Sequence, residues 1–201
     1  MTNNERFPFN NIHPTALIAE GVQIGRGNTI GPYCVIGFPA EWKGREVEGK
    51  VVIGDNNTIT GLVTIDSGTD NPTLIGNNCY LMKGVHIGHD AKIFNGVTIS
   101  CGAKIGGHAR IYDQANIGLN ACIHQNQVIK PGAMIGMGAI VTKKLVVEAF
   151  KTYAGNPAKL IGENSKHPLY EAYKASLITQ GPDGHKDWDP LNYTINMKDT
   201  L

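Results

Sequence analysis

The sequence lacks three features that would point to common classes of protein. Eighteen Lys and Arg residues stand against 17 Asp and Glu residues, so no overall field attracts nucleic acid or an anionic membrane. No apolar run approaches the roughly 18 residues of a transmembrane helix. Residues 1–11, MTNNERFPFNN, lack the charged and then apolar pattern of a secretion signal. We therefore expect a soluble, cytoplasmic protein with no nucleic-acid partner and no membrane span.

Cysteine is also scarce, and no two cysteines form a CxxC pair. A zinc knuckle or a small disulfide scaffold is therefore not indicated, and we interpret the cysteines as small apolar fillers. The four are Cys34, Cys79, Cys101 and Cys122. Glycine, by contrast, is abundant at 25 residues, while only 17% of residues are charged. This composition indicates many tight corners.

A period of six residues dominates the chain. Between residues 75 and 141 an aliphatic residue occupies every sixth position: Ile75, Leu81, Ile87, Ile93, Ile99, Ile105, Ile111, Ile117, Ile123, Ile129, Ile135 and Val141. The same period holds at Ile12, Ile18, Ile24, Ile30 and Ile36, and again at Ile53, Ile59 and Ile65. Two insertions, near 37–52 and 66–74, interrupt it. The repeat predicts a solenoid rather than a chain of separate elements.

Six residues suit one short strand and one corner, so three units make a coil of 18 residues. Stacked coils pair their strands in parallel, about 4.8 Å apart, and the aliphatic residues fill the inside of a triangular prism. Twenty units predict nearly seven coils over residues 1–146. Residues 147–201 are expected to form an exit, AGNPAKLIG at 154–162, then a short helix over HPLYEAYKASLI at 167–178 and an extended tail.

Four of the seven histidines fall on one edge of three adjacent coils when residues 18 apart are stacked. They are His86, His89, His108 and His124. Histidines on neighbouring strands can bind zinc, but no clear third-ligand set accompanies them, and we predict no metal. A catalytic cluster explains more. A non-catalytic binding platform, on which the cluster is accidental, remains an alternative.

The residues around His89 contain the parts of an acyl-transfer site. His89 is the candidate general base, and Asp90 can hold its imidazole in one tautomer. Gly107 lies one coil above His89, and its backbone N–H can bind an oxyanion. These parts let a hydroxyl or amine attack a thioester without a nucleophilic Ser or Cys.

The repeat resembles the hexapeptide-repeat, left-handed parallel β-helix family. Within it, HIGHD followed by IGGHAR and IHQ is similar to the active-site motif of UDP-N-acetylglucosamine acyltransferases of lipid A synthesis. The resemblance implies the left-handed winding, which the general rule for parallel crossovers does not predict. It also implies the roles given above for His89, Asp90 and Gly107. The residues that it places against the sugar nucleotide or the reacting groups are His86, His108, His124 and Gln125.

Further site residues follow from the same resemblance. Glu41 and Lys43, in the first insertion, match residues that bind the acceptor. Met137 matches the position that limits acyl length, although an ordinary core Met is the alternative. The exit, with Asn156, resembles that of acetyltransferases that use coenzyme A. The chain departs from the acyltransferase pattern at Asp66, where the family has a histidine, and in lacking its longer C-terminal helical domain.

We therefore expect an acyltransferase with no bound cofactor. An acyl group would pass from acyl carrier protein or coenzyme A, which stays open, to a hydroxyl or amine of a nucleotide-linked amino sugar. A sugar acetyltransferase that uses coenzyme A is one alternative, and a zinc enzyme of the γ-carbonic-anhydrase type is another. The resemblance also implies a homotrimer with the site between subunits.

Overall fold

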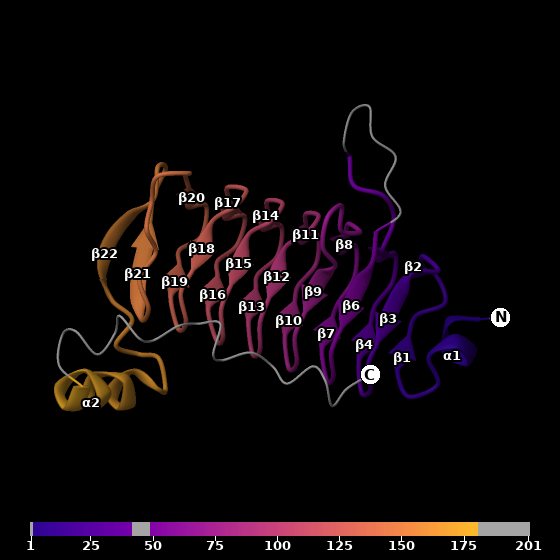
Figure 1. The fold of residues 1–201 in the computed structure, drawn as a ribbon, viewed down its shortest axis with the longest axis horizontal. Helices are drawn as coiled ribbons and strands as arrows, with labels where there is room; N and C mark the ends of the chain where they lie inside the picture. Colours follow the sequence, from indigo (N-terminus) through magenta and orange to yellow (C-terminus); the bar gives the residue numbers. More distant parts are fainter. Residues whose placement is uncertain (1, 42–48, 181–201) are drawn as a thin grey trace.

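A computed structural model of the chain describes residues 2–41 and 49–180, which form a triangular solenoid (Figure 1). Its three faces are sheets of parallel strands, with one antiparallel strand at the end of the first. From β1 to β20 each sheet takes every third strand of the chain, and β21 and β22 are then added to the first sheet. The fold is the left-handed parallel β-helix that the six-residue period and the family resemblance predicted.

The strands are short, as one side of a six-residue unit requires. The nine-stranded sheet contains β1 (Asn11–Ile12), β4 (Thr29–Ile30), β7 (Thr58–Ile59), β10 (Tyr80–Leu81), β13 (Thr98–Ile99), β16 (Asn116–Ile117), β19 (Met134–Ile135), β21 (Lys151–Ala154) and β22 (Lys159–Glu163). The seven-stranded sheet contains β2 (Leu17–Ile18), β5 (Val35–Ile36), β8 (Thr64–Ile65), β11 (His86–Ile87), β14 (Lys104–Ile105), β17 (Cys122–Ile123) and β20 (Ile140–Val141). The six-stranded sheet contains β3 (Val22–Ile24), β6 (Val51–Ile53), β9 (Thr73–Ile75), β12 (Lys92–Ile93), β15 (Arg110–Ile111) and β18 (Val128–Ile129).

The register of the strands confirms the repeat. Ile87 pairs with Ile105, and Ile105 pairs with Ile123, each 18 residues on. The first insertion lengthens one step, so Ile24 pairs with Ile53. Each of the twenty predicted units ends in one of the strands β1–β20. Both insertions leave the register of the aliphatic residues unchanged, since Ile24 pairs with Ile53 and Ile53 pairs with Ile75.

The core is the inside of the prism. From Ile30 to Val141 every large aliphatic residue of the repeat is at most 3% exposed. Parallel strands buried in this way give a continuous apolar column along each sheet. Residues at the corners adopt left-handed backbone angles, for example Asp90 with φ +59° and His108 with φ +58°. The stacked strands therefore fix the direction of every corner side chain.

The N-terminal end of the solenoid is covered by a short helix that the sequence reading missed. Helix α1 (Asn3–Arg6) places Arg6 so that its guanidinium donates to the carbonyl oxygens of Ile18, Ala19 and Glu20. These contacts satisfy three carbonyl groups at the open edge of the first coil, where uncovered strands can pair with another chain.

The C-terminal end continues the stack before leaving it. β21 pairs in parallel with β19, and β22 turns back against β21. Helix α2 (Tyr170–Gln180) begins three residues later than predicted and packs through Tyr170 and Tyr173 on Phe150 at the last corner. It therefore lies beside the last corner between the six- and nine-stranded sheets, near the C-terminal end of the prism (Figure 1). None of the helices formed by the described residues is long and apolar enough to span a bilayer.

Candidate active site

The candidate site lies on one long edge of the prism, where strands of the seven-stranded sheet lead into strands of the six-stranded sheet. We call this the histidine edge. Its segments include 88–91, 106–109 and 124–127, and both insertions begin and end on it, between β5 and β6 and between β8 and β9. The two interruptions of the period between Ile12 and Val141 therefore both start beside the histidines.

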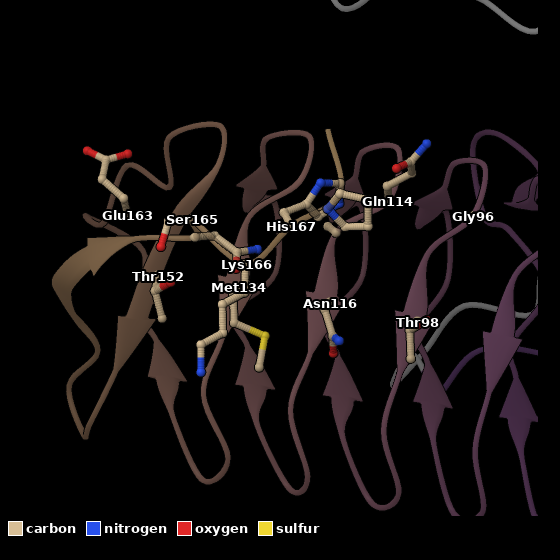
Figure 2. A pocket seen from close by; sticks show the side chains of 13 residues that line it. Gly96, Thr98, Gln114, Asn116, Met134, Thr152, Glu163, Ser165, Lys166 and His167 are labelled. Carbon is tan, nitrogen blue, oxygen red and sulfur yellow. The ribbon is translucent and has the colours of Figure 1, made fainter. Parts of the chain in front are cut away.

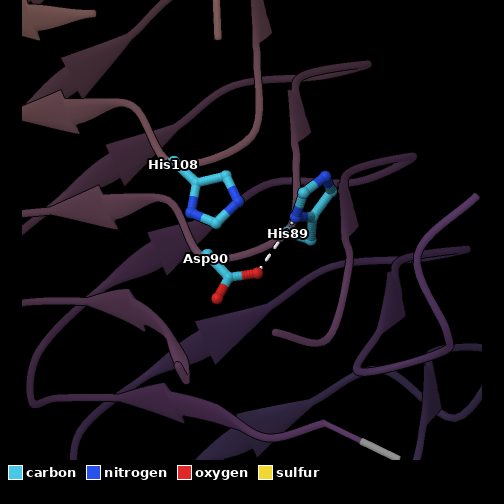
Figure 3. Close-up of side chains that lie close together, drawn as sticks. All are labelled: His89, Asp90 and His108. Carbon is cyan, nitrogen blue, oxygen red and sulfur yellow. Dashed lines mark hydrogen bonds and ion pairs between the residues drawn. The ribbon is translucent and has the colours of Figure 1, made fainter. Parts of the chain in front are cut away.

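His89 and Asp90 form the centre of the site. His89 Nδ1 lies 3.0 Å from Asp90 Oδ2, and the two side chains are 24% and 1% exposed (Figure 3). A carboxylate can only accept, so Nδ1 carries the proton and Nε2 keeps its lone pair. The predicted orientation of the imidazole by Asp90 is present in this geometry.

The Asp90 carboxylate is held by the second insertion. Its Oδ2 accepts from the Thr69 N–H at 2.7 Å and the Thr69 hydroxyl at 2.8 Å, while Oδ1 accepts from Asp70 N–H and Asn71 N–H at 3.0 and 2.6 Å. Burial alone would raise the pKa of Asp90. The hydrogen bonds from Thr69, Asn71 and His89 outweigh burial and hold the pKa of this carboxyl well below its usual range. Asp90 is therefore ionised at neutral pH.

Gly107 lies directly beneath the His89 ring. A Cβ at this position would stand 2.7 Å from His89 Nε2 and 2.8 Å from Cε1, so a side chain and the ring cannot share the space. The Gly107 N–H donates to no acceptor within residues 2–41 and 49–180. It remains available, beside Nε2, to an atom that binds there.

His108 completes the group of side chains at this corner. Its ring meets that of His89 edge to face, with centroids 5.0 Å apart and planes at 88° (Figure 3). Its backbone N–H donates to the His89 carbonyl at 2.9 Å, which locks the two corners together. The predicted convergence of His89, Asp90, Gly107 and His108 is therefore present.

A pocket of about 400 Å³ adjoins this group and contains two more predicted residues. Its lining comprises Val35, Phe38, Pro39, Glu41, Thr64, Ile65, Asp66 and His86. His86 Nδ1 lies 2.8 Å from the Thr64 hydroxyl, and Nε2 lies 3.7 Å from Asp66 Oδ2. Burial raises the pKa of the Asp66 carboxyl; the charges of His86 and His89 act against this rise, and that of Glu41 adds to it.

The other predicted residues lie further from His89 or outside the described part. His124 and Gln125 are exposed one coil beyond Gly107, and His124 Nδ1 donates to the Gln125 carbonyl at 2.8 Å. Met137, 75% exposed, lies on the edge between the nine- and seven-stranded sheets. Asn156 lies in the turn between β21 and β22, which hydrogen-bonds to Ile140 of β20 through Gly155 and Ala158 and so stands near the same edge. Neither lies on the histidine edge. Lys43 falls outside the described residues.

The side chains of His89, Asp90 and His108 could also be considered as metal ligands, because one ligand atom from each lies within 4.8 Å of the others. The donor set does not suit a metal. Both Asp90 oxygens already accept N–H or O–H bonds, and His89 Nδ1 is turned to Asp90. A cation would have to displace contacts that hold the second insertion in place.

The sequence reading missed the role of the second insertion. Thr69, Asp70 and Asn71 supply four of the five hydrogen bonds to Asp90. The interruption between Ile65 and Ile75 separates the same two sheets as His89 does, so stacking both on the 18-residue map would have placed them together. The specific contacts depend on loop conformation, which the period does not determine.

A larger cavity, of about 780 Å³, lies on the nine-stranded sheet and away from the histidine edge (Figure 2). Thr98, Asn116 and Thr152 line it from the sheet, and residues 163–168 close it. Two of its titratable side chains have structural partners: Glu163 is paired with Lys151, and His167 Nδ1 accepts from the Leu169 N–H. It contains no counterpart of the His89–Asp90 pair.

A prism of hexapeptide coils with a histidine–aspartate pair on one edge defines a class, the hexapeptide-repeat transferases. The family model described as bacterial transferase hexapeptide (six repeats) matches residues 72–107. This segment runs from the end of the second insertion to Gly107, so it contains His89, Asp90 and Gly107.

Known proteins narrow the class. An acyl-[acyl-carrier-protein]–UDP-N-acetylglucosamine O-acyltransferase from Rickettsia canadensis is 34% identical over 41% of this chain and 46% of the relative. The crystal structure of a UDP-N-acetylglucosamine acyltransferase from Bacteroides fragilis is 34% identical, with a TM-score of 0.74 over 86% of this chain and 72% of that one. The acyltransferase from Campylobacter jejuni is 25% identical, with a TM-score of 0.67 over 94% of both chains.

The chain therefore belongs to the hexapeptide-repeat acyltransferase family. It spans about half the length of the curated relatives that it matches.

Proposed function

We propose that the protein transfers an acyl group from a thioester to a hydroxyl or amine of a nucleotide-linked amino sugar. The observation that carries the proposal is the His89–Asp90 pair, with Nδ1 bonded to the carboxylate and Nε2 held over Gly107. The relatives named as UDP-N-acetylglucosamine acyltransferases support this reaction and this class of acceptor.

The chemistry follows from the three groups. The acceptor oxygen or nitrogen bonds to the thioester carbon while His89 Nε2 takes the proton from that oxygen or nitrogen. The carbonyl oxygen becomes an oxyanion, which the Gly107 N–H stabilises. The C–S bond then breaks, and the imidazolium returns its proton to the departing thiolate. Asp90 stabilises the imidazolium while it exists.

The remaining site residues have assigned roles in the same proposal. Glu41, Lys43, His86 and His108 bind the acceptor, with His124 and Gln125 one coil further on. Met137 and Asn156, at or near the opposite edge of the seven-stranded sheet, contact the acyl chain or the donor. Met137 and Asn156 stand away from His89 within one subunit. In a homotrimer, a second subunit closes the site and brings its own Met137 and Asn156 to the acceptor-binding residues. The donor is acyl carrier protein or coenzyme A carrying the acyl group, and no cofactor stays bound.

An assay of acyl transfer tests the proposal directly. The wild type receives UDP-N-acetylglucosamine with acyl carrier protein thioesters and with acyl-coenzyme A thioesters in parallel. We expect product with one donor, and a loss of at least about 1,000-fold in kcat for His89→Ala, because the group that removes the acceptor proton is lost. Sugar-nucleotide binding and the melting temperature should change little.

Two controls separate the alternatives. His13→Ala removes an exposed histidine that lies outside the site and should leave transfer unchanged. Metal analysis of the purified protein tests the zinc alternative: stoichiometric zinc, with activity lost on chelation, would contradict base catalysis by His89. Full activity in His89→Ala would contradict it as well.

A further inference from the structure

The two insertions on the histidine edge contact each other through the backbone. The first comprises residues 37–50, between β5 and β6, and the second comprises residues 66–72, between β8 and β9. The N–H of Ser67, a residue that is 2% exposed, donates to the Phe38 carbonyl at 2.9 Å. The start of the first insertion is therefore bonded to the start of the second.

The end of the first insertion closes the second into a loop. The Lys50 carbonyl accepts from the Gly68 N–H at 3.1 Å and from the Thr73 N–H at 3.0 Å. These two donors stand on either side of residues 69–71, which supply the protein donors of the Asp90 carboxylate other than His89. The segment that holds Asp90 is therefore closed by an atom of the other insertion.

Three glycines bring these backbones closer together than side chains would allow. A methyl group added at Gly49 would overlap the Gly68 carbonyl oxygen, and one added at Gly68 would overlap the Asn71 carbonyl oxygen. A methyl group at Gly21, in the first coil, would stand 3.2 Å from the Gly49 carbonyl oxygen. Such close approach of backbone to backbone requires glycine. The first coil, the two insertions and Asn71 therefore follow one another in close backbone contact.

This stack of backbones ends at the candidate base. The Asn71 N–H donates to Asp90 Oδ1 at 2.6 Å, and Asp90 Oδ2 lies 3.0 Å from His89 Nδ1. A shift of Gly68 moves the donors of Asp90, and the imidazole follows the carboxylate to which it is bonded. Misplacing a reacting group by about 1 Å can lower a rate about 100-fold. The orientation of His89 therefore depends on backbone contacts made well beyond Asp90.

We propose that Gly49 and Gly68 are positioning residues, through which the first insertion fixes the Asp90 carboxylate and hence the His89 imidazole. Neither glycine supplies one of the five hydrogen bonds to Asp90, so both act through the loop that does. The inference rests on the proposed function, in which His89 is the base. It also gives a reason for both insertions to begin on the same edge as the base.

The test compares Gly49→Ala and Gly68→Ala with Gly31→Ala as a matched control. Gly31 lies on the edge between the nine- and seven-stranded sheets, and a methyl group there would likewise overlap a backbone carbonyl oxygen, that of Thr60. None of the three glycines has a left-handed φ, so the overlap is the common perturbation. Gly21→Ala makes the milder contact and provides a second probe of the stack if the closer overlaps prevent folding.

Acyl-transfer assays give kcat and KM for each variant. We expect kcat of Gly49→Ala and Gly68→Ala to fall about 10- to 100-fold, the cost of a misplaced reacting group, with a smaller change in KM because the acceptor still binds. Gly31→Ala should lower the melting temperature by a similar amount and keep the wild-type kcat. Gly21→Ala should lose kcat in the same direction but to a smaller extent.

Melting temperatures at pH 7 and pH 2 test the position of Asp90 without an activity assay. Its donors hold the pKa of Asp90 low in the folded state, so this stabilisation is present above the unfolded value of about 4 and is lost as the pH falls through the folded value. Loosened donors raise the folded value, so the melting temperatures of Gly49→Ala and Gly68→Ala should decrease less in acid than that of the wild type. The titratable residues beside Asp90 are the same in every variant: His89, His108 and Asp70.

Three results would overturn the inference. The first is a wild-type kcat with a wild-type response to acid in Gly49→Ala, or in Gly21→Ala where Gly49→Ala does not fold. The second is an equal loss of kcat in Gly31→Ala, which would assign the effect to general destabilisation. The third is a loss of kcat with an unchanged response to acid, because the glycines would then act on a group other than Asp90.

Failure of the proposed function looks different from failure of this inference. The wild type would then transfer no acyl group from either donor, while the response of the melting temperature to acid would still show whether the first insertion positions Asp90.

Discussion

Two edges of the same prism use the same corner geometry for different purposes. On the edge between the six- and nine-stranded sheets, here called the asparagine edge, side-chain amides bond to the backbone of the neighbouring coil. Asn57, 1% exposed, accepts from the Cys79 N–H and donates to the Gly76 carbonyl, both at 2.8 Å. On the histidine edge, His89 Nε2 and the Gly107 N–H are turned outward instead.

A second column of side chains on the asparagine edge also holds neighbouring coils together. Backbone N–H groups donate in turn to the side chains of the next coil, along Asp55, Asn77, Asn95 and Asp113. The column ends there because the next residue, Pro131, has no side-chain acceptor. The asparagine edge therefore uses its side-chain amides and carboxylates to hold neighbouring coils together, whereas the histidine edge places the His89 ring beside the Gly107 backbone, an arrangement suited to chemistry.

The largest expected effect comes from filling the space beneath His89. Gly107→Ala places a methyl group 2.7 Å from Nε2, so the ring must swing away from the Gly107 N–H. We expect kcat to fall about 100- to 1,000-fold, the cost of losing an oxyanion donor or its alignment. The free energy of unfolding should change by less than about 1 kcal/mol, because the clash involves only a side chain that can move.

Gly136→Ala is the matched control for that variant. Its added methyl meets the Ala154 methyl at 3.1 Å, away from the histidine edge, and should leave turnover unchanged. A Gly107→Ala enzyme with wild-type turnover would show that the outward N–H of the histidine edge takes no part in the reaction.

The second prediction concerns the stability of the asparagine edge rather than turnover. Asn57→Ala leaves the Cys79 N–H and the Gly76 carbonyl unpaired inside the stack and should cost about 2–4 kcal/mol of unfolding free energy, with turnover retained below the melting temperature. His124→Ala, on an exposed corner of the histidine edge, should cost less than about 0.5 kcal/mol. Urea denaturation measures both. Equal costs would mean that the two edges do not differ in the way their hydrogen bonds indicate.

The sequence was sufficient for the fold because the same six-residue rule acts twenty times, and stacking residues 18 apart placed His89, Asp90, Gly107 and His108 together. Loop contacts did not follow from the period. Thr69 lies in an insertion whose conformation is set by its hydrogen bonds to Asp90 rather than by strand stacking. Helix α1 was missed because its four residues show no apolar periodicity, and Met137 matched a family position without lying on the histidine edge.

Substitution of Thr69 should give the smallest effect. It is also the sharpest test of the difference between the two edges, because at Thr69 the histidine edge uses hydrogen bonds to hold a corner side chain in place, as the asparagine edge does. Thr69→Val removes the hydroxyl that lies 2.8 Å from Asp90 Oδ2 and keeps the backbone donor. We expect a loss of about 1–2 kcal/mol in unfolding free energy and a decrease in kcat of about 3- to 10-fold, because the carboxylate that orients His89 is less firmly held. Thr73→Val removes a hydroxyl that accepts from the Asp90 backbone N–H, so it should lower stability without slowing transfer.

The pH dependence of stability separates a contact with the charge from mere packing. Because the pKa of Asp90 is depressed in the folded state, its ionisation stabilises the fold above the unfolded value of about 4, and this contribution is lost as the pH falls through the folded value. Removing one donor in Thr69→Val raises the folded value, so less stability is available to lose in acid. The melting temperature of Thr69→Val should therefore decrease less between pH 7 and pH 2 than that of the wild type. If the two decreases are equal, the Thr69 hydroxyl contributes packing alone. The depressed pKa of Asp90 is then due to the backbone N–H donors of the second insertion.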